Sequence, residues 1–140
     1  MIKKYLILLL IFCTSANAAK YQIGIFNCKG SKDAQGHFFF PPSGTQIQIA
    51  KENNKTLINI SPFLVTMRKL NSVELEGNHN FRGTKVYVKF NSKKYSGIFK
   101  IHDPGQKELT FEFSCDFLHM HPSEITLTEL NKREQSLLRK

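Results

Sequence analysis

Four residues near the end of this sequence form its one local group with metal-ligand chemistry. Cys115 is followed by His119, Met120 and His121. Residues two apart share a face in an extended segment, so the two histidines would point to one side. Imidazole and thioether groups suit copper or zinc. A structural zinc site normally has four protein ligands, and only His119 and His121 have local support. A copper or zinc site is therefore an alternative to a plain polar segment leaving the last strand.

The N-terminal residues determine which cysteines remain in the mature chain. Two lysines precede the short apolar run Tyr5–Cys13, and Ala16-Asn17-Ala18 offers the small residues that a signal peptidase reads. The run is shorter than the roughly 20 residues that span a bilayer, so no transmembrane segment is expected. We predict that residues 1–18 are a signal peptide, with cleavage after Ala18 or next after Ala19. A lipoprotein signal at Cys13 is the alternative. The mature chain would be periplasmic or secreted, and bacterial.

Cleavage would leave two cysteines, Cys28 and Cys115. Export places them in an oxidising compartment, so we predict one disulfide between them, with free buried thiols as the alternative. Lys+Arg would fall from 20 to 18 while Asp+Glu stays at 11, so the formal charge would fall from +9 to +7. A basic exported chain suits anionic partners, although the charge also serves solubility alone.

Period-two alternation of apolar and polar residues dominates between Tyr21 and Ser114. It predicts an all-β fold, a barrel or a sandwich of about eight short antiparallel strands. The segments Thr45–Ile49 and Thr56–Ile60 form a predicted hairpin. We interpret Gly77–Asn80 as a turn-rich loop, and Leu109–Ser114 as the last strand, which ends at Cys115.

The C-terminal residues follow a different pattern. Residues 19–121 make one disulfide-closed β domain, and residues 122–140 make a helical tail. Thr126 or Thr128 can cap a helix from Thr128 to about Arg139. Its partial apolar stripe consists of Leu130, Leu137 and Leu138. The sequence leaves open whether this helix packs on the β domain or is loosely held.

The clearest strand carries the best candidate binding surface. In Thr84–Phe90 the lysines and tyrosine at odd positions share the face opposite the valines at 86 and 88. A turn then returns the chain, and further basic and aromatic residues extend the face. The predicted surface consists of Lys85, Tyr87, Lys89, Lys94 and Tyr95. It would bind an envelope or extracellular protein, or an anionic polymer. The alternative is that these lysines guard an exposed sheet edge against pairing.

Catalytic patterns are absent from the sequence. It has no G-x-S-x-G motif and no paired carboxylates, so we do not expect an enzyme. A small secreted hydrolase remains an alternative, in which His37, His102 or His119 would act with a lysine. Tyr87-Val88-Lys89-Phe90 is similar to the end of an RNA-recognition signature, but Val86 stands where Gly or Ala is needed, and nucleic acid is not the expected partner.

In leader, size and cysteine placement the chain loosely resembles small periplasmic lysozyme inhibitors, which are disulfide-closed β barrels. Their Ser-Gly-x-x-Tyr loop has no match here, because Tyr95-Ser96-Gly97-Ile98-Phe99 has a different order. No inhibitor residue is therefore carried over. The expected function is that of an exported, non-enzymatic binding domain, with metal binding and hydrolysis as alternatives.

Overall fold

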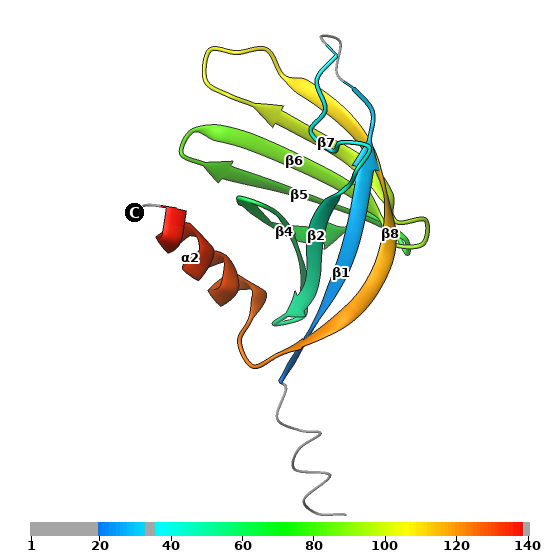
Figure 1. Cartoon of the computed structure of the whole chain (residues 1–140), viewed down its shortest axis with the longest axis vertical. Helices are drawn as coiled ribbons and strands as arrows, with labels where there is room; N and C mark the ends of the chain where they lie inside the picture. Colours follow the sequence, from blue (N-terminus) through cyan, green and yellow to red (C-terminus); the bar gives the residue numbers. More distant parts are fainter. Residues whose placement is uncertain (1–19, 33–35, 139–140) are drawn as a thin grey trace, which may run out of the picture.

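The computed structural model of the protein describes residues 20–32 and 36–138. The predicted signal peptide, residues 1–18, lies outside them. Eight antiparallel strands form a closed barrel in chain order, with β1 paired to β8 (Figure 1). The elements are β1 (Tyr21–Gly30), β2 (Thr45–Glu52), β3 (Lys55–Ile60), β4 (Phe63–Lys69), β5 (Glu74–Phe81), β6 (Thr84–Asn91), β7 (Ser96–His102), β8 (Leu109–Ser123) and the helix α2 (Leu127–Leu138). The predicted all-β fold class is confirmed, and of the two predicted architectures the protein has the barrel.

The alternating pattern of the strands places one face of each strand inside the barrel. Along β6, Val86, Val88 and Phe90 are buried, while the residues between them reach the outer face. The interior is rich in aromatic rings, and several stack or meet edge to face, as Phe90 and Phe113 do. Most of the phenylalanines in the sequence therefore fill the core.

The two ends of the barrel differ. We call the end with the segment between β1 and β2 the plugged end, because Phe39 and Phe40 from that segment close it. The Phe39 ring stacks on Phe99 at 4.3 Å, and the Phe40 ring stacks on Phe113 at 4.7 Å, both measured between ring centroids. We call the other end the open end. It carries the start of β1, the β2–β3 turn and the connections at residues 70–73 and 92–95.

One predicted turn is wrong. Gly77 to Asn80 belong to β5, and the chain reverses at Arg82 and Gly83, both with positive φ. Gly77 is needed for a close approach rather than a turn, because a Cβ there would collide with the carbonyl oxygen of Thr66 on β4. The glycine and asparagines have the composition of a turn, and the sequence does not show that β4 lies beside them.

The last strand is longer than predicted. β8 does not end at Cys115 but continues to Ser123, because the first half of β1 pairs with it. The register shifts between Ile25 and Phe26, so a bulge lies in this ribbon. This long ribbon extends the barrel wall at the open end. It also passes the predicted domain boundary at residue 121.

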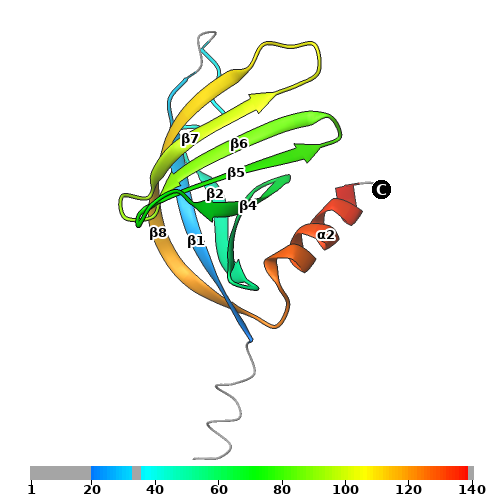
Figure 2. The ribbon, with the colours of Figure 1, turned by 180° about the vertical axis from the view of Figure 1, so that it is seen from behind.

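Helix α2 packs on the outside of the barrel (Figures 1 and 2). A second apolar cluster lies under it, made by Ile23, Ile25, Ala50, Leu57 and Leu127. Glu52 accepts hydrogen bonds from the backbone N–H groups of Leu127 and Thr128, at 2.7 and 3.3 Å, and from the Thr128 hydroxyl. The Thr126 hydroxyl also accepts from the N–H of Glu129, as an N-cap does. The helix is therefore held at its start by the barrel.

The predicted apolar stripe of the helix is only partly correct. Leu130 packs against the cluster under α2, but Leu137 is 70% exposed. The buried face is instead completed by polar groups. Asn131 donates a hydrogen bond to Asn59 on β3 at 3.2 Å, and Gln135 donates to the carbonyl oxygen of Pro62 at 3.0 Å.

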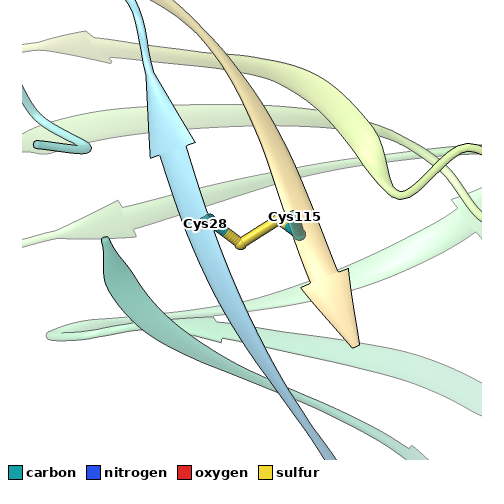
Figure 3. The surroundings of a disulfide bond; sticks show 2 residues. All are labelled: Cys28 and Cys115. Carbon is teal, nitrogen blue, oxygen red and sulfur yellow. A yellow bond between two sulfur atoms is a disulfide. The ribbon is translucent and has the colours of Figure 1, made fainter. Parts of the chain in front are cut away.

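Cys28 and Cys115 form the predicted disulfide between β1 and β8 (Figure 3). They are direct partners in the register of the two strands, and both are buried in the barrel core. The bond thus joins the first and last strands where the barrel closes, and such a bond fits an oxidising compartment. Among residues 20–32 and 36–138, no helix has the length and apolar character needed to cross a membrane.

Candidate functional site

The predicted basic-aromatic residues of β6 lie on the outer face of the barrel. Across the strands, Tyr87 pairs with Lys100 and Lys85 pairs with His102, so all four share that face. The ammonium group of Lys100 lies 5.7 Å from the centroid of the Tyr87 ring, within the range of a cation–π contact. Lys85 is exposed, whereas Tyr87 and Lys100 are half-buried. The cations of β6 and β7 therefore share one outer face with the Tyr87 ring, and Lys100 contacts that ring.

Acidic residues of β5 border this face. Lys89 forms an ion pair with Glu74, with 3.1 Å between Nζ and Oε2. The Tyr87 hydroxyl donates a hydrogen bond to Glu76 at 2.9 Å, and Arg68 forms an ion pair with the same carboxylate. These hydrogen bonds, the one from Tyr87 first, hold the pKa of Glu76 below its ordinary value of 4.5. The outer face therefore carries both charges: the acidic residues lie on β5, and the basic residues extend from β6 onto β7.

Tyr87 and Glu74 on this face also have shifted pKa values. Burial first, and then the hydrogen bond to Glu76, raises the pKa of Tyr87 above 10.0. The pKa of Glu74 is lowered first by its hydrogen bond with Asn71 and then by Lys89. Both carboxylates are therefore ionised at neutral pH.

Lys94 and Tyr95 lie outside β6, the strand that carries the other three predicted residues. Both are in the connection between β6 and β7 at the open end, where Tyr95 has a positive φ of 54°. The Tyr95 ring turns toward the barrel and meets Phe26 edge to face, with 5.1 Å between centroids. Lys94 lines a hollow on the outer face together with Lys89 and Glu74. Of the five predicted residues, Lys85, Tyr87 and Lys89 share one face of β6, Lys94 joins Lys89 at this hollow, and Tyr95 is separate from them.

The edge-guarding interpretation of these lysines does not fit the barrel. β6 pairs with β5 along its whole length and with β7 on its other side. A closed barrel has no free strand edge to protect. The lysines of β6 therefore do not protect a sheet edge. Solubility and partner binding are the two remaining explanations for them.

His119 and His121 lie on β8, opposite Ile25 and Ile23 of β1. The register places both on the outer face, as the prediction required, and both side chains are exposed. Within the part of the chain that the structure describes, no group of three or more histidine, cysteine or acidic side chains is arranged to hold a metal ion. Cys115 is in the disulfide and offers no thiolate. The copper or zinc site stays a prediction that rests on two side chains.

The histidines considered for hydrolysis lie in different parts of the barrel. His37 is in the segment that plugs one end, and His102 ends β7 at that same end. His119 lies on the outer face of the long β1–β8 ribbon, beyond the bulge. The structure does not gather the three into one group, and the hydrolase interpretation stays untested.

A pocket of about 570 Å³ lies at the open end of the barrel. We call it the end pocket. Its deeper walls are apolar: Phe26, Ile49, Leu75 and Phe90 come from four different strands. Tyr95 from the β6–β7 connection and Met120 from the β8 extension complete the apolar wall. Gly24 faces the same region, because a Cβ there would meet the Phe26 ring at 3.1 Å and the Met120 sulfur at 3.6 Å.

The rim of the end pocket is basic. Lys20, Lys51 and Lys69 contribute to its lining, and all three are exposed. Among the described residues that line it, none is acidic. Apolar side chains also remain exposed at this end. They are Leu70, Tyr95, Phe117 and Met120, with exposed fractions between 36% and 50%.

Among the residues that line the end pocket, sequence reasoning singled out Tyr95 for the basic-aromatic surface and Met120 for the metal-ligand group, and it missed the rest as a site. Phe26, Leu75 and Phe90 have the alternation of ordinary core residues, and nothing in that pattern distinguishes a wall from a filled interior. One signal was available. Lys51 and Lys69 stand at strand ends where the inner-facing pattern stops, next to turn-forming residues.

Comparisons of this chain with protein-family models, with curated proteins and with solved structures found no match.

Proposed function

We propose that this protein is an exported, non-enzymatic binding domain whose outer face on β6 and β7 recognises a protein partner. The observation that carries the proposal is the arrangement of Lys85, Tyr87 and Lys100 on strands that have neighbours on both sides. Tyrosine is enriched at protein–protein interfaces, and clustered positive charges attract an acidic partner.

The charges around this face favour a protein over a uniform anionic polymer. Glu74 and Glu76 lie beside Lys89 and Tyr87 and are ionised at neutral pH. A polyanion laid across the whole face would meet these carboxylates as like charges, which costs binding energy. A protein can instead place an acidic group against Lys85 and Lys100 and a donor against the glutamates. An anionic polymer remains the alternative partner.

The experiment compares two charge-reversal variants that carry the same net charge. Lys85→Glu/Lys100→Glu alters the proposed face, and Lys51→Glu/Lys69→Glu alters the rim of the end pocket on a different part of the surface. Each is used with the wild type to recover partners from envelope extract of the native source. We expect a protein that is recovered by the wild type and the rim variant but lost from the face variant.

A photo-crosslinking residue at position 87 supplies the second readout, with position 118 as the control because Leu118 is exposed but lies on β8. The same protein should crosslink at position 87 and not at position 118. Equal recovery by both charge variants would remove the assignment of this face. Loss of a polysaccharide or other polyanion, without any protein, would move the proposal to the polymer alternative.

A further inference from the structure

The end pocket has the size and lining of a ligand site, and it is separate from the outer face of β6 and β7. Its volume of about 570 Å³ lies in the range of about 300–1,000 Å³ typical of small-molecule pockets. The opposite end of the barrel is closed by Phe39 and Phe40, stacked on Phe99 and Phe113. A ligand would therefore enter and leave only through the open end.

The walls determine which part of a ligand lies inside. Phe26 and Phe90, with rings 6.4 Å apart between centroids, are buried, and Ile49 and Leu75 are partly buried beside them. None of these four side chains donates or accepts a hydrogen bond, so a polar group buried against them would lose its hydration without replacement. The inner part of the ligand must be hydrocarbon.

The rim determines the other part of the ligand. Lys20 directly precedes β1, and Lys51 and Lys69 lie near or at the ends of β2 and β4. Their positive charges surround one opening without an acidic lining residue in the described part of the chain. An anionic group at the mouth of the pocket would be attracted by all three and would remain near water, where the lysines are exposed.

The exposed apolar side chains at the open end add a second, independent observation. Met120 is 50% exposed and Phe117 is 44% exposed, although both lie on the inner side of the β1–β8 ribbon. The Phe117 ring meets Phe26 edge to face, at 5.3 Å between centroids. Apolar groups gathered at a pocket mouth, rather than scattered singly, mark a binding region.

We propose that the end pocket binds an amphiphile with a single hydrocarbon chain and an anionic head, the chain lying against Phe26, Phe90 and Met120 and the head lying among Lys20, Lys51 and Lys69. A free fatty acid and a lysophospholipid with an acidic head share this chemistry. The site is distinct from the outer face of β6 and β7, so each proposal can be tested and rejected without the other.

The test is isothermal titration calorimetry of the full chain, produced with its own leader, at ligand concentrations below micelle formation. Three ligands with the same chain length are used: dodecanoate, dodecyltrimethylammonium and lauroyl lysophosphatidylglycerol. We expect dodecanoate to bind one to one, and at least about tenfold more tightly than the cationic ligand. Comparable binding of dodecanoate and the lysophospholipid indicates that the head charge suffices. A strong preference for one of them identifies the source.

Variants locate the binding. Met120→Glu places a negative charge at the pocket wall at a half-exposed position, and Met120→Leu keeps the apolar surface. We expect Met120→Glu and Lys51→Glu/Lys69→Glu each to weaken dodecanoate binding at least about tenfold, while Met120→Leu and the face variant Lys85→Glu/Lys100→Glu leave it unchanged. Unchanged far-ultraviolet circular dichroism shows that the variants are folded.

Three results would overturn the proposal. They are equal affinity for the anionic and cationic ligands, equal affinity of the rim and face variants for dodecanoate, and no measurable binding of any of the three ligands. Recovery of an envelope protein that is lost only from the rim variant would assign the pocket to a peptide segment instead.

Discussion

At the scale of single residues, Glu76 shows how neighbouring strands set the chemistry of the outer face. It accepts a hydrogen bond from Tyr87 and forms an ion pair with Arg68, from two different strands. Its pKa is lowered, so the stability that it contributes is present above its ordinary value of 4.5 and is lost as the pH falls through the pKa of the folded state.

Replacement of Tyr87 by Phe removes the largest cause of that shift. We expect the pKa of Glu76 to rise toward its ordinary value, because the carboxylate loses a hydrogen bond that favoured its charged form. The carboxyl carbon shift of Glu76, followed by NMR during an acid titration, measures this. Glu74 serves as the internal control, since its lowered pKa depends first on Asn71. A Glu76 titration midpoint that is unchanged in Tyr87→Phe would contradict the assigned cause.

At the scale of elements, helix α2 depends on the barrel for its first turn. Isolated helices of this length are marginal in water, so tertiary contacts must supply its stability. Glu52 of β2 satisfies the backbone N–H groups of Leu127 and Thr128 and places a negative charge at the positive end of the helix. Beneath the helix, Leu127 is fully buried on the outer face of the barrel.

Glu52→Ala removes this anchor. We expect a loss of about 1–2 kcal/mol in the free energy of unfolding, the size of a lost helix cap. Urea unfolding followed by circular dichroism at the helical wavelength measures it. Glu108→Ala is the matched control, because Glu108 is exposed in the loop between β7 and β8. Equal stability of the two variants would show that Glu52 does not hold the helix.

Leu127→Ala tests the apolar half of the same attachment. Truncation of a fully buried leucine costs about 2–5 kcal/mol. Leu137 lies on the same helix and is 70% exposed, so its side chain makes few apolar contacts that truncation could remove. Leu137→Ala should therefore lower the free energy of unfolding far less. Thermal unfolding of the two variants side by side separates these cases. Similar losses in both would mean that α2 is not docked through Leu127.

At the scale of the whole molecule, the barrel closes where its first and last strands meet. The Cys28–Cys115 bond lies at this seam and spans a sequence separation of 87 residues. The ten-residue β1 pairs with β8 along its length, so the folded barrel holds the two cysteines together even without the bond. The disulfide therefore acts mainly on the unfolded chain, whose freedom it restricts.

The double variant Cys28→Ser/Cys115→Ser should fold to the same barrel and unfold more easily. For a loop of this size, chain entropy predicts a loss of roughly 4–5 kcal/mol, with smaller values common in practice. Urea unfolding with and without reductant measures the loss. Reductant should destabilise the wild type by a similar amount and leave the double variant unaffected. A reductant effect on the double variant would show that the disulfide is not its target.

The sequence by itself determined most of the strands, the two faces of a regular strand such as β6, and the pair of cysteines, but not the second half of β5 or of β8. These follow from period-two alternation and from cysteine count, both of which are local properties of the chain. Lys85, Tyr87 and Lys89 were predicted on one face for the same reason, and they lie there.

Only the tertiary structure decided which strands are neighbours, because register depends on contacts between residues far apart in the chain. It paired Lys89 with Glu74, placed Lys100 over the Tyr87 ring, and turned Tyr95 toward Phe26. It made Gly77 a point of close approach in place of a turn. It also separated pocket walls from filled core, since Phe90 and Phe99 have the same pattern in the sequence and differ only in which end of the barrel they face.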